Sequence, residues 1–363
     1  MDEPLQPSRK PLGFWKTVLA TFVGGLTASI VFSVLFFLLS LLIGSLLSQS
    51  APKTIEENSV LKINLSSISE LVTADPWSTF LPSRGEGEQS ISLTQALAAI
   101  RKAKANDRIR GIYLNLDSYS GGMASTADLR AALLDFRSSG KFVVAYADSY
   151  DQKAYYLSSV ADQLILNPEG SVGLVGLASS SLFYHQALEK LGLKAQVFKV
   201  GTYKGAVEPF ILDQLSEPNR EQISVYLSGL WDFILREVSA SRSIPVDSLR
   251  SFADQGLAFS EAETFVRRRL VDTLAYRLDV EGFIARRAGV SSPKDLHVVT
   301  LADLVNAPDP LDATRKSKED VVTVVYAEGE IGDNPLSSEG ITQELAQRLR
   351  ELREDDKAKA IVL

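Results

Sequence analysis

The sequence of 363 residues contains no cysteine and only two histidines. Without cysteine there can be no disulfide bridge, thiolate nucleophile or cysteine-ligated metal site. His185 and His297 lie in separate, largely apolar segments, so we expect structural roles rather than a catalytic metal site or a Ser-His-Asp triad. A net charge of −7 also disfavours a nucleic-acid partner, because binding one requires a basic surface that displaces phosphate counterions.

Charged side chains are missing from a long stretch near the N-terminus. No charge occurs between Thr17 and Pro52, and Ile30–Ile43 is almost wholly apolar. About 20 apolar residues cross a bilayer, and a cleaved signal peptide has a shorter apolar region. The sequence therefore predicts an uncleaved, single-pass anchor. Arg9, Lys10 and Lys16 precede the span, which predicts a cytoplasmic N-terminus and an extracytoplasmic location for the bulk of the chain.

Past the anchor, short apolar segments alternate with stretches of helical spacing. Val60–Leu65 alternates like a strand, Leu93–Ala105 has helical spacing, and Ile109–Leu116 is a second apolar strand. Strands that alternate with helices of this length indicate βαβ units and a mostly parallel sheet. The same criteria predict further strands at 142–147, 195–200 and 296–299, and helices at 127–137, 152–160, 216–240 and 260–284.

The pattern restarts near the C-terminus. Ile341–Ala346 resembles Leu93–Ala98, and Asp356–Leu363 resembles Asp107–Leu114. Self-similarity of long period indicates a duplicated domain, although two amphipathic helix–strand units can also be alike by chance. The predicted organisation is a cytoplasmic stub and anchor at 1–52, a first α/β repeat at 53–312, and a linker with the truncated start of a second repeat at 313–363.

The most specific motif is KVGTYKGAVEPF, residues Lys199–Phe210. Lys204 lies in it between Tyr203 and Gly205. A lysine acts as a general base only when neutral, and desolvation favours that state. From spacing alone, the favoured interpretation of Lys204 is an ordinary solvated lysine.

This motif resembles the lysine motif of peptidase family S49, in the long form called signal peptide peptidase A or protease IV. The likeness runs over nearly the whole chain. It implies a ClpP/crotonase-like fold, no cofactor or metal, a ring-shaped homo-oligomer, and hydrolysis of peptides such as cleaved signal peptides at the membrane. The family's general base corresponds to Lys204. Ser171, Gly173 and Tyr203 are expected to contact substrate, with a tight turn as the alternative for the Gly-Ser-Val-Gly stretch.

The nucleophile of this family is a serine in the second repeat, after the strand that corresponds to the one ending at Leu363. The resemblance thus implies a serine beyond Leu363. In the first repeat, Met123 takes the equivalent place, and a thioether cannot be deprotonated to attack a carbonyl. Ser118, Ser120 and Ser125 are close in sequence but not at that position.

The glycines before Met123 leave two interpretations open. The backbone N–H groups of Gly121 and Gly122 could hold an oxyanion, or the pair could simply form a turn that needs no side chain. Two other functions also stay open. One is a truncated, non-catalytic, membrane-anchored protein that binds peptides or acts as a scaffold. The other is a crotonase-like acyl-CoA enzyme, which the anchor and the lysine motif disfavour.

Overall fold

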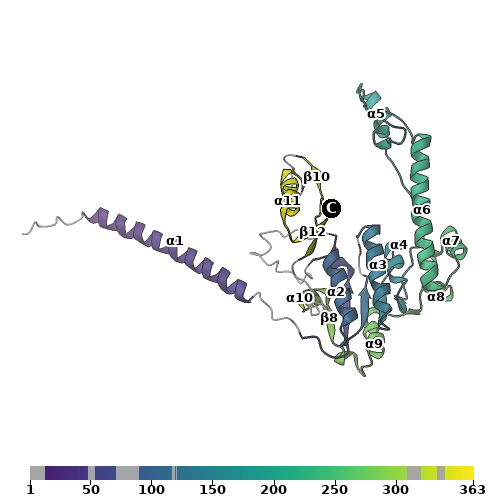
Figure 1. Ribbon diagram of the computed structural model, residues 1–363, viewed down its shortest axis with the longest axis horizontal. Helices are drawn as coiled ribbons and strands as arrows, with labels where there is room; N and C mark the ends of the chain where they lie inside the picture. Colours follow the sequence, from purple (N-terminus) through teal and green to yellow (C-terminus); the bar gives the residue numbers. More distant parts are fainter. Residues whose placement is uncertain are drawn as a thin grey trace, which may run out of the picture. The chain divides into compact units, whose positions relative to one another are not determined.

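The computed structural model describes residues 13–47, 54–70, 90–116, 119, 121–308, 320–332 and 340–363 (Figure 1). The chain divides into two compact units, Met1–Ala307 and Pro308–Leu363. The first unit contains an apolar helix and an α/β sheet. The second contains a smaller set of strands around one helix.

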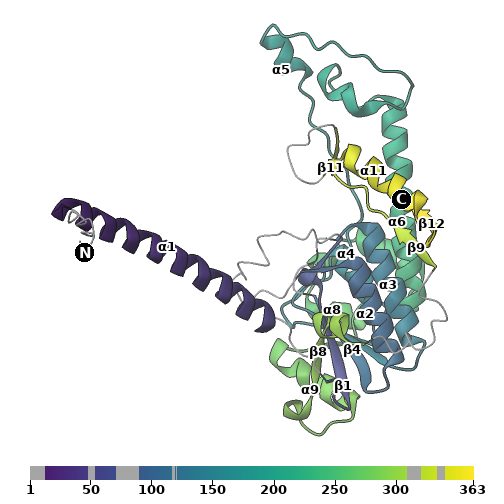
Figure 2. The same cartoon turned by 60° about the vertical axis from the view of Figure 1, so that its left-hand side comes forward.

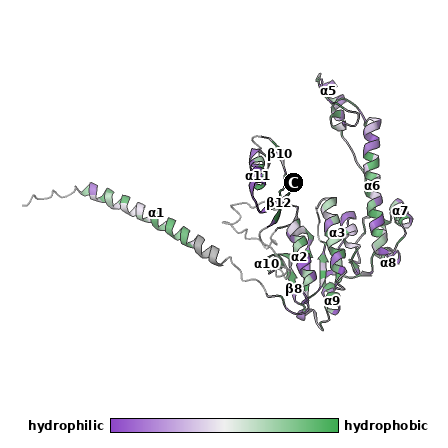
Figure 3. Cartoon of the chain, in the orientation of Figure 1, coloured by the Kyte–Doolittle hydropathy of each residue, from purple (hydrophilic) through white to green (hydrophobic). Residues whose placement is uncertain are grey.

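The apolar segment near the N-terminus forms helix α1, Phe14–Leu47. Figure 3 shows it as a mainly hydrophobic helix. Its stretch Phe14–Ser40, 27 residues, is the one helix among the described residues that is long and apolar enough to cross a membrane. At 1.5 Å per residue it would span roughly 40 Å, more than the hydrocarbon core of a bilayer. The predicted apolar helix is confirmed, and it suits a membrane anchor or a signal sequence.

The first unit is built on a six-stranded sheet with the order β7-β6-β5-β4-β1-β8, in which all neighbouring strands pair in parallel. Every residue of the central strand β5 is buried, because helices cover both faces of the sheet at this point. The predicted α/β class with a mostly parallel sheet is thereby confirmed. The strands are β1 Ser59–Asn64, β4 Ile109–Asn115, β5 Phe142–Ala147, β6 Gln163–Leu166, β7 Thr273–Leu274 and β8 Val298–Thr300.

The buried apolar side chains of this unit form two cores. Figure 2 shows the helices that lie along the sheet. The larger core packs against α2 Leu93–Ala105, α3 Met123–Arg137, α4 Gln152–Ser158 and the C-terminal half of α6 Glu217–Arg242. The smaller core packs against α9 Arg277–Ala288. Shorter helices, α7 Val246–Asp254, α8 Ala262–Arg267 and α10 Leu301–Asn306, complete the large core.

Two predicted elements differ from the structure. No strand forms at 195–200, where Phe198 and Val200 are 94% and 91% exposed. This segment follows the short helix α5, His185–Lys190, and pairs with no neighbouring strand, so β propensity alone does not order it as a sheet. The predicted helix 260–284 is divided into α8, the edge strand β7 and α9, because the chain turns back at Arg269 with a left-handed φ of 61°.

The second unit repeats an order of elements found in the first. In the first unit, β1 and β4 pair in parallel, with β2 Ile68–Ser69, β3 Ile91–Ser92 and α2 between them in the chain. In the second unit, β9 Val321–Val324 and β12 Ala358–Val362 pair in parallel, with β10 Glu330–Ile331, β11 Gly340–Ile341 and α11 Gln343–Glu354 between them. A duplicated βαβ element would produce this correspondence.

Candidate active site around Lys204

Lys204 lies at the end of a tight turn. Gly201 opens this turn with a φ of +106°, a conformation that glycine adopts without steric cost. The Lys204 N–H group reaches back to the Gly201 carbonyl over 3.5 Å. A 3-10 helix, Gly205–Phe210, follows directly. The turn therefore presents Lys204 on its outer side, where the side chain is exposed.

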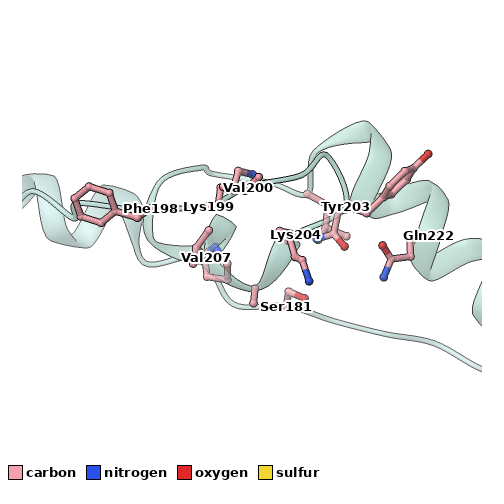
Figure 4. A pocket seen from close by; sticks show the side chains of 13 residues that line it. Ser181, Phe198, Lys199, Val200, Tyr203, Lys204, Val207 and Gln222 are labelled. Atoms are coloured by element: carbon pink, nitrogen blue, oxygen red, sulfur yellow. The ribbon is translucent and has the colours of Figure 1, made fainter.

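Lys204 lines an open cavity of about 660 Å³ (Figure 4). Lys204 and its sequence neighbour Tyr203 both line this cavity, and their proposed roles stay predictions. Sequence reasoning did not identify Ser181, which lines the same cavity from the segment before α5. No hydrogen bond joins Ser181 to Lys204. Other lining residues include Phe198, Lys199, Val200, Val207 and Gln222.

The cavity contains two lysines that differ in their partners. Lys199 Nζ lies 4.0 Å from the carboxylate of Glu208. Within the described part of the chain, Lys204 Nζ has neither an ion pair nor a hydrogen bond. Its side chain is exposed to solvent.

Glu208 is the buried charge of this region. Its side chain is 0% exposed and accepts hydrogen bonds from Ser216 N at 3.1 Å, Ser216 Oγ at 2.5 Å and Asn219 Nδ2 at 3.0 Å. The hydrogen bond from the Ser216 hydroxyl is the main cause that lowers the pKa of Glu208 below its ordinary value. Ser216 is also the N-cap of α6, so this carboxylate lies against the positive end of a long helix.

The Gly-Ser-Val-Gly stretch lies apart from the residues that line the Lys204 cavity. Ser171 N donates to Ser149 Oγ at 3.2 Å, and Gly173 N donates to the Tyr150 carbonyl at 2.7 Å. A Cβ at Gly173 would come within 3.2 Å of that carbonyl oxygen. These contacts are those of residues in a tight turn, the alternative considered for Ser171 and Gly173. Their contact with substrate stays a prediction.

The Glu70 carboxylate engages the backbone N–H of Gly122, one of the two glycines considered above as oxyanion donors. Gly122 N donates to Glu70 Oε1 at 3.2 Å, and Ser125 Oγ donates to the same oxygen at 2.5 Å. The Ser125 hydrogen bond is the first cause of a lowered pKa at Glu70. Met123 begins α3 directly after this contact. Ser118 and Ser120, also considered from the sequence, lie outside the described residues.

The two histidines have different surroundings. His185 Nδ1 lies 3.1 Å from Asp213 Oδ1, at the start of α5. The His297 carbonyl accepts the Val60 N–H at 2.8 Å beside the sheet. In the described part of the chain, no group of three or more His, Asp or Glu residues is arranged to hold a metal ion.

A second polar cluster lies at the carboxyl ends of β4, β5 and β6. Arg277 Nη2 donates to Asp148 Oδ2 at 2.6 Å, and Tyr146 and Asn167 donate to Asp148 Oδ1 at 2.6 and 2.9 Å. These bonds, led by the one from Tyr146, lower the pKa of Asp148 to about 2. Burial raises the pKa of Tyr146 to about 12. Since its members satisfy one another, this cluster fixes the start of α9 on the sheet.

Comparison with known proteins adds a family to this geometry. The model of peptidase family S49 matches residues 135–291, which include the lysine turn and its cavity. Protease 4 of Salmonella typhi is 36% identical over 286 residues, which are 76% of this chain and 45% of that protein. Protease 4 of Haemophilus influenzae is 32% identical over 284 residues, 76% of this chain and 46% of that protein. The chain thus spans slightly less than half the length of these relatives.

Among solved structures, the chain is similar to a membrane-bound stomatin-specific protease in complex with a substrate peptide. That similarity covers 72% of this chain and 97% of the other, with 13% identity and a TM-score of 0.35. The relatives are therefore identified by the sequence matches, and not by the weak structural similarity.

Proposed function

Because the chain belongs to peptidase family S49, we propose that it serves peptide hydrolysis as a membrane-anchored serine–lysine peptidase, with Lys204 as general base. The observation that carries this proposal is the place of the motif lysine. Lys204 lines a cavity beside Tyr203 and has no ion-pair partner among the described residues, while the other lysine of the cavity faces a carboxylate. A base needs an amine that no neighbouring charge holds protonated.

The proposed reaction follows from this assignment. Neutral Lys204 takes the proton of a serine hydroxyl while the serine oxygen attacks the peptide carbonyl, and the ammonium then protonates the leaving amine, which leaves the acyl group on the serine. Water, which gives a proton to Lys204, then attacks this ester, and the serine oxygen leaves and takes the proton back, so that the acid product is released. We propose that the serine comes from a second repeat, beyond Leu363, and that it brings its own oxyanion donors. The Gly122 N–H of the first repeat is already engaged by Glu70. The second repeat that carries this serine would also cover Lys204 and exclude water from it.

The location and substrates are proposed from the anchor and the relatives. Helix α1 would hold the chain in a membrane, with the N-terminus cytoplasmic and the sheet on the extracytoplasmic side. Substrates at that surface would be peptides such as cleaved signal peptides. A ring of several copies would join their lysine cavities around a shared space. In this arrangement, the membrane would concentrate the enzyme and its apolar substrates.

The test compares the 363-residue protein with a version extended through a Gly-Gly-Ser motif. We expect the 363-residue protein neither to cleave fluorogenic peptides nor to react with a fluorophosphonate. In the extended protein, Lys204→Ala should lower kcat by about 10²–10⁴-fold, the usual contribution of a general base. Lys190→Ala, an exposed lysine of α5 outside the cavity, is the matched control and should not change kcat.

Two results would contradict this proposal. Equal activity of the Lys204→Ala and Lys190→Ala proteins would remove Lys204 from the reaction. Cleavage by the 363-residue protein, abolished by Lys204→Ala, would show that a serine within it or in a neighbouring copy completes the dyad. Ser181→Ala would then identify the serine within the cavity.

One observation favours a second function, that of a non-catalytic peptide-binding or scaffold protein. Within the described residues, Lys204 has no hydroxyl group at hydrogen-bond distance, and Met123 stands where the resemblance places a nucleophile. Such a protein would bind labelled peptides in a fluorescence anisotropy titration without cleaving them in either the 363-residue or the extended form.

A further inference from the structure

The buried carboxylate of Glu208 lies four residues after Lys204, in a segment that is otherwise largely exposed. We propose that Glu208 is a positioning residue, whose carboxylate clamps the turn that carries Lys204 to the first turn of α6. The catalytic value of this clamp rests on the proposed function of Lys204. The clamp itself is a property of the fold.

The surroundings of Glu208 suit an ionised carboxylate. A buried charge is costly unless hydrogen bonds and opposite charges replace the lost water. Glu208 receives three hydrogen bonds from Ser216 and Asn219, and Lys199 lies 4.0 Å away. It also faces the N-terminus of α6, a helix of 26 residues whose dipole favours negative charge at that end.

Asn219 links Glu208 to the turn that carries Lys204, because its side chain contacts both. Asn219 Nδ2 donates to Glu208 at 3.0 Å, and the same amide group lies against Gly205, the residue directly after Lys204. A Cβ placed on Gly205 would be only 2.3 Å from Asn219 Nδ2. The turn therefore rests on a side chain whose orientation Glu208 fixes. On the other side of the turn, the Lys204 N–H bond to Gly201 is long, at 3.5 Å, and constrains the lysine less.

Glu208 also separates the roles of the two lysines in the cavity. Its carboxylate lies 4.0 Å from Lys199 Nζ, so Lys199 has an ion-pair partner. Lys204 stays without a carboxylate partner among the described residues. One buried glutamate thus holds the turn that carries the proposed base and also lies beside Lys199, the other amine of the cavity.

Hydrogen exchange of the 363-residue protein tests the clamp without any substrate. The Ile211 and Leu212 amides bond to the Glu208 carbonyl at 3.0 and 2.8 Å, so a peptide covering 206–212 reports the clamped segment. We expect Glu208→Gln and Asn219→Ala each to speed its exchange about tenfold. Because the two side chains act as one unit, the double variant should also reach about tenfold rather than the hundredfold of independent effects. Glu208→Asp, which keeps the charge, should lie nearer to the wild type than Glu208→Gln.

The control and the contrary outcomes are equally specific. Glu263→Gln, an exposed glutamate of α8, should leave 206–212 unchanged, and all variants should leave β5 unchanged. Equal exchange in the Glu208→Gln and Glu263→Gln proteins, a hundredfold effect in the double variant, or faster exchange throughout the sheet would overturn the clamp. If Glu208→Gln fails to fold, Gly205→Ala pushes Asn219 aside directly. It should give the same local tenfold effect, and unchanged exchange would then refute the proposal.

This test is separate from that of the proposed function. Lys204→Ala removes the proposed base but should leave the exchange of 206–212 as in the wild type. A protein in which Lys204→Ala has no effect on cleavage would refute the catalytic role and leave the clamp intact. Unaltered exchange in the Glu208→Gln protein would refute the clamp and leave the catalytic role of Lys204 intact.

Discussion

Replacement of Arg130 by alanine should lower the free energy of unfolding of the first unit more than replacement of an exposed charged residue. Arg130 lies on α3 with its side chain 2% exposed. Its guanidinium donates to the Tyr156 carbonyl and Ser159 Oγ near the end of α4, and to the Glu237 carbonyl and Ser241 Oγ on α6. One side chain therefore ties three helices together.

The magnitude follows from the groups that alanine would leave behind. Two backbone carbonyls and two hydroxyls would lose a charged donor, and each buried group without a partner costs about 1–3 kcal/mol. Two effects reduce this loss. Water that enters the vacated space would satisfy some of these groups. The cost of desolvating the guanidinium, the main cause that lowers the Arg130 pKa, would also disappear. We expect a net loss of about 3–5 kcal/mol, the usual range when one partner is removed from a buried charged network.

The assay is urea unfolding of the detergent-solubilised chain, followed by far-UV circular dichroism. Arg137→Ala is the matched control, because Arg137 lies on the same helix and pairs with Asp162 at a partly exposed site. That pair should contribute about 1 kcal/mol or less. Arg130→Lys should fall between, since an ammonium cannot reach partners on both helices at once. Equal losses for Arg130→Ala and Arg137→Ala would refute the reasoning.

Two further predictions concern the sheet. Gly111→Ala should lower the free energy of unfolding in urea by about 1–3 kcal/mol, because the new Cβ would come within 2.4 Å of the Phe142 ring. Gly229→Ala in α6 is the comparison. Open space surrounds Gly229, so this change should raise the free energy of unfolding by about 0.5–1 kcal/mol. Asp148 has a pKa lowered from 3.8 to about 2, so its stabilising effect is present above about pH 4 and is lost as the pH falls towards 2. Asp148→Asn should therefore flatten the loss of stability over that interval, and an unchanged acid limb would contradict the assignment.

Much of the fold could be predicted because its signals are local. The continuous apolar run of β5 and the uncharged stretch of α1 each depend on neighbouring residues only. The lysine motif, Lys199–Phe210, is also contiguous in sequence. The segment 195–200 shows the limit, because its apolar residues resemble a strand but no strand lies beside them to complete the hydrogen bonds.

The contacts that organise the site could not be predicted in this way. Glu208 depends on Asn219, eleven residues later, and Glu70 depends on Gly122 and Ser125, more than fifty residues away. A single sequence gives no signal for such pairs, because glutamate, asparagine and serine are common at the surface. Only the fold shows that these side chains meet.

The Glu70 contact bears on what single substitutions at this turn could achieve. A serine introduced at position 123 would find the Gly122 amide already engaged by a carboxylate, and loss of Glu70 alone would free an amide beside a methionine. Neither change by itself would place a hydroxyl group beside a free backbone N–H. The turn could acquire that pair of groups only through two substitutions made together.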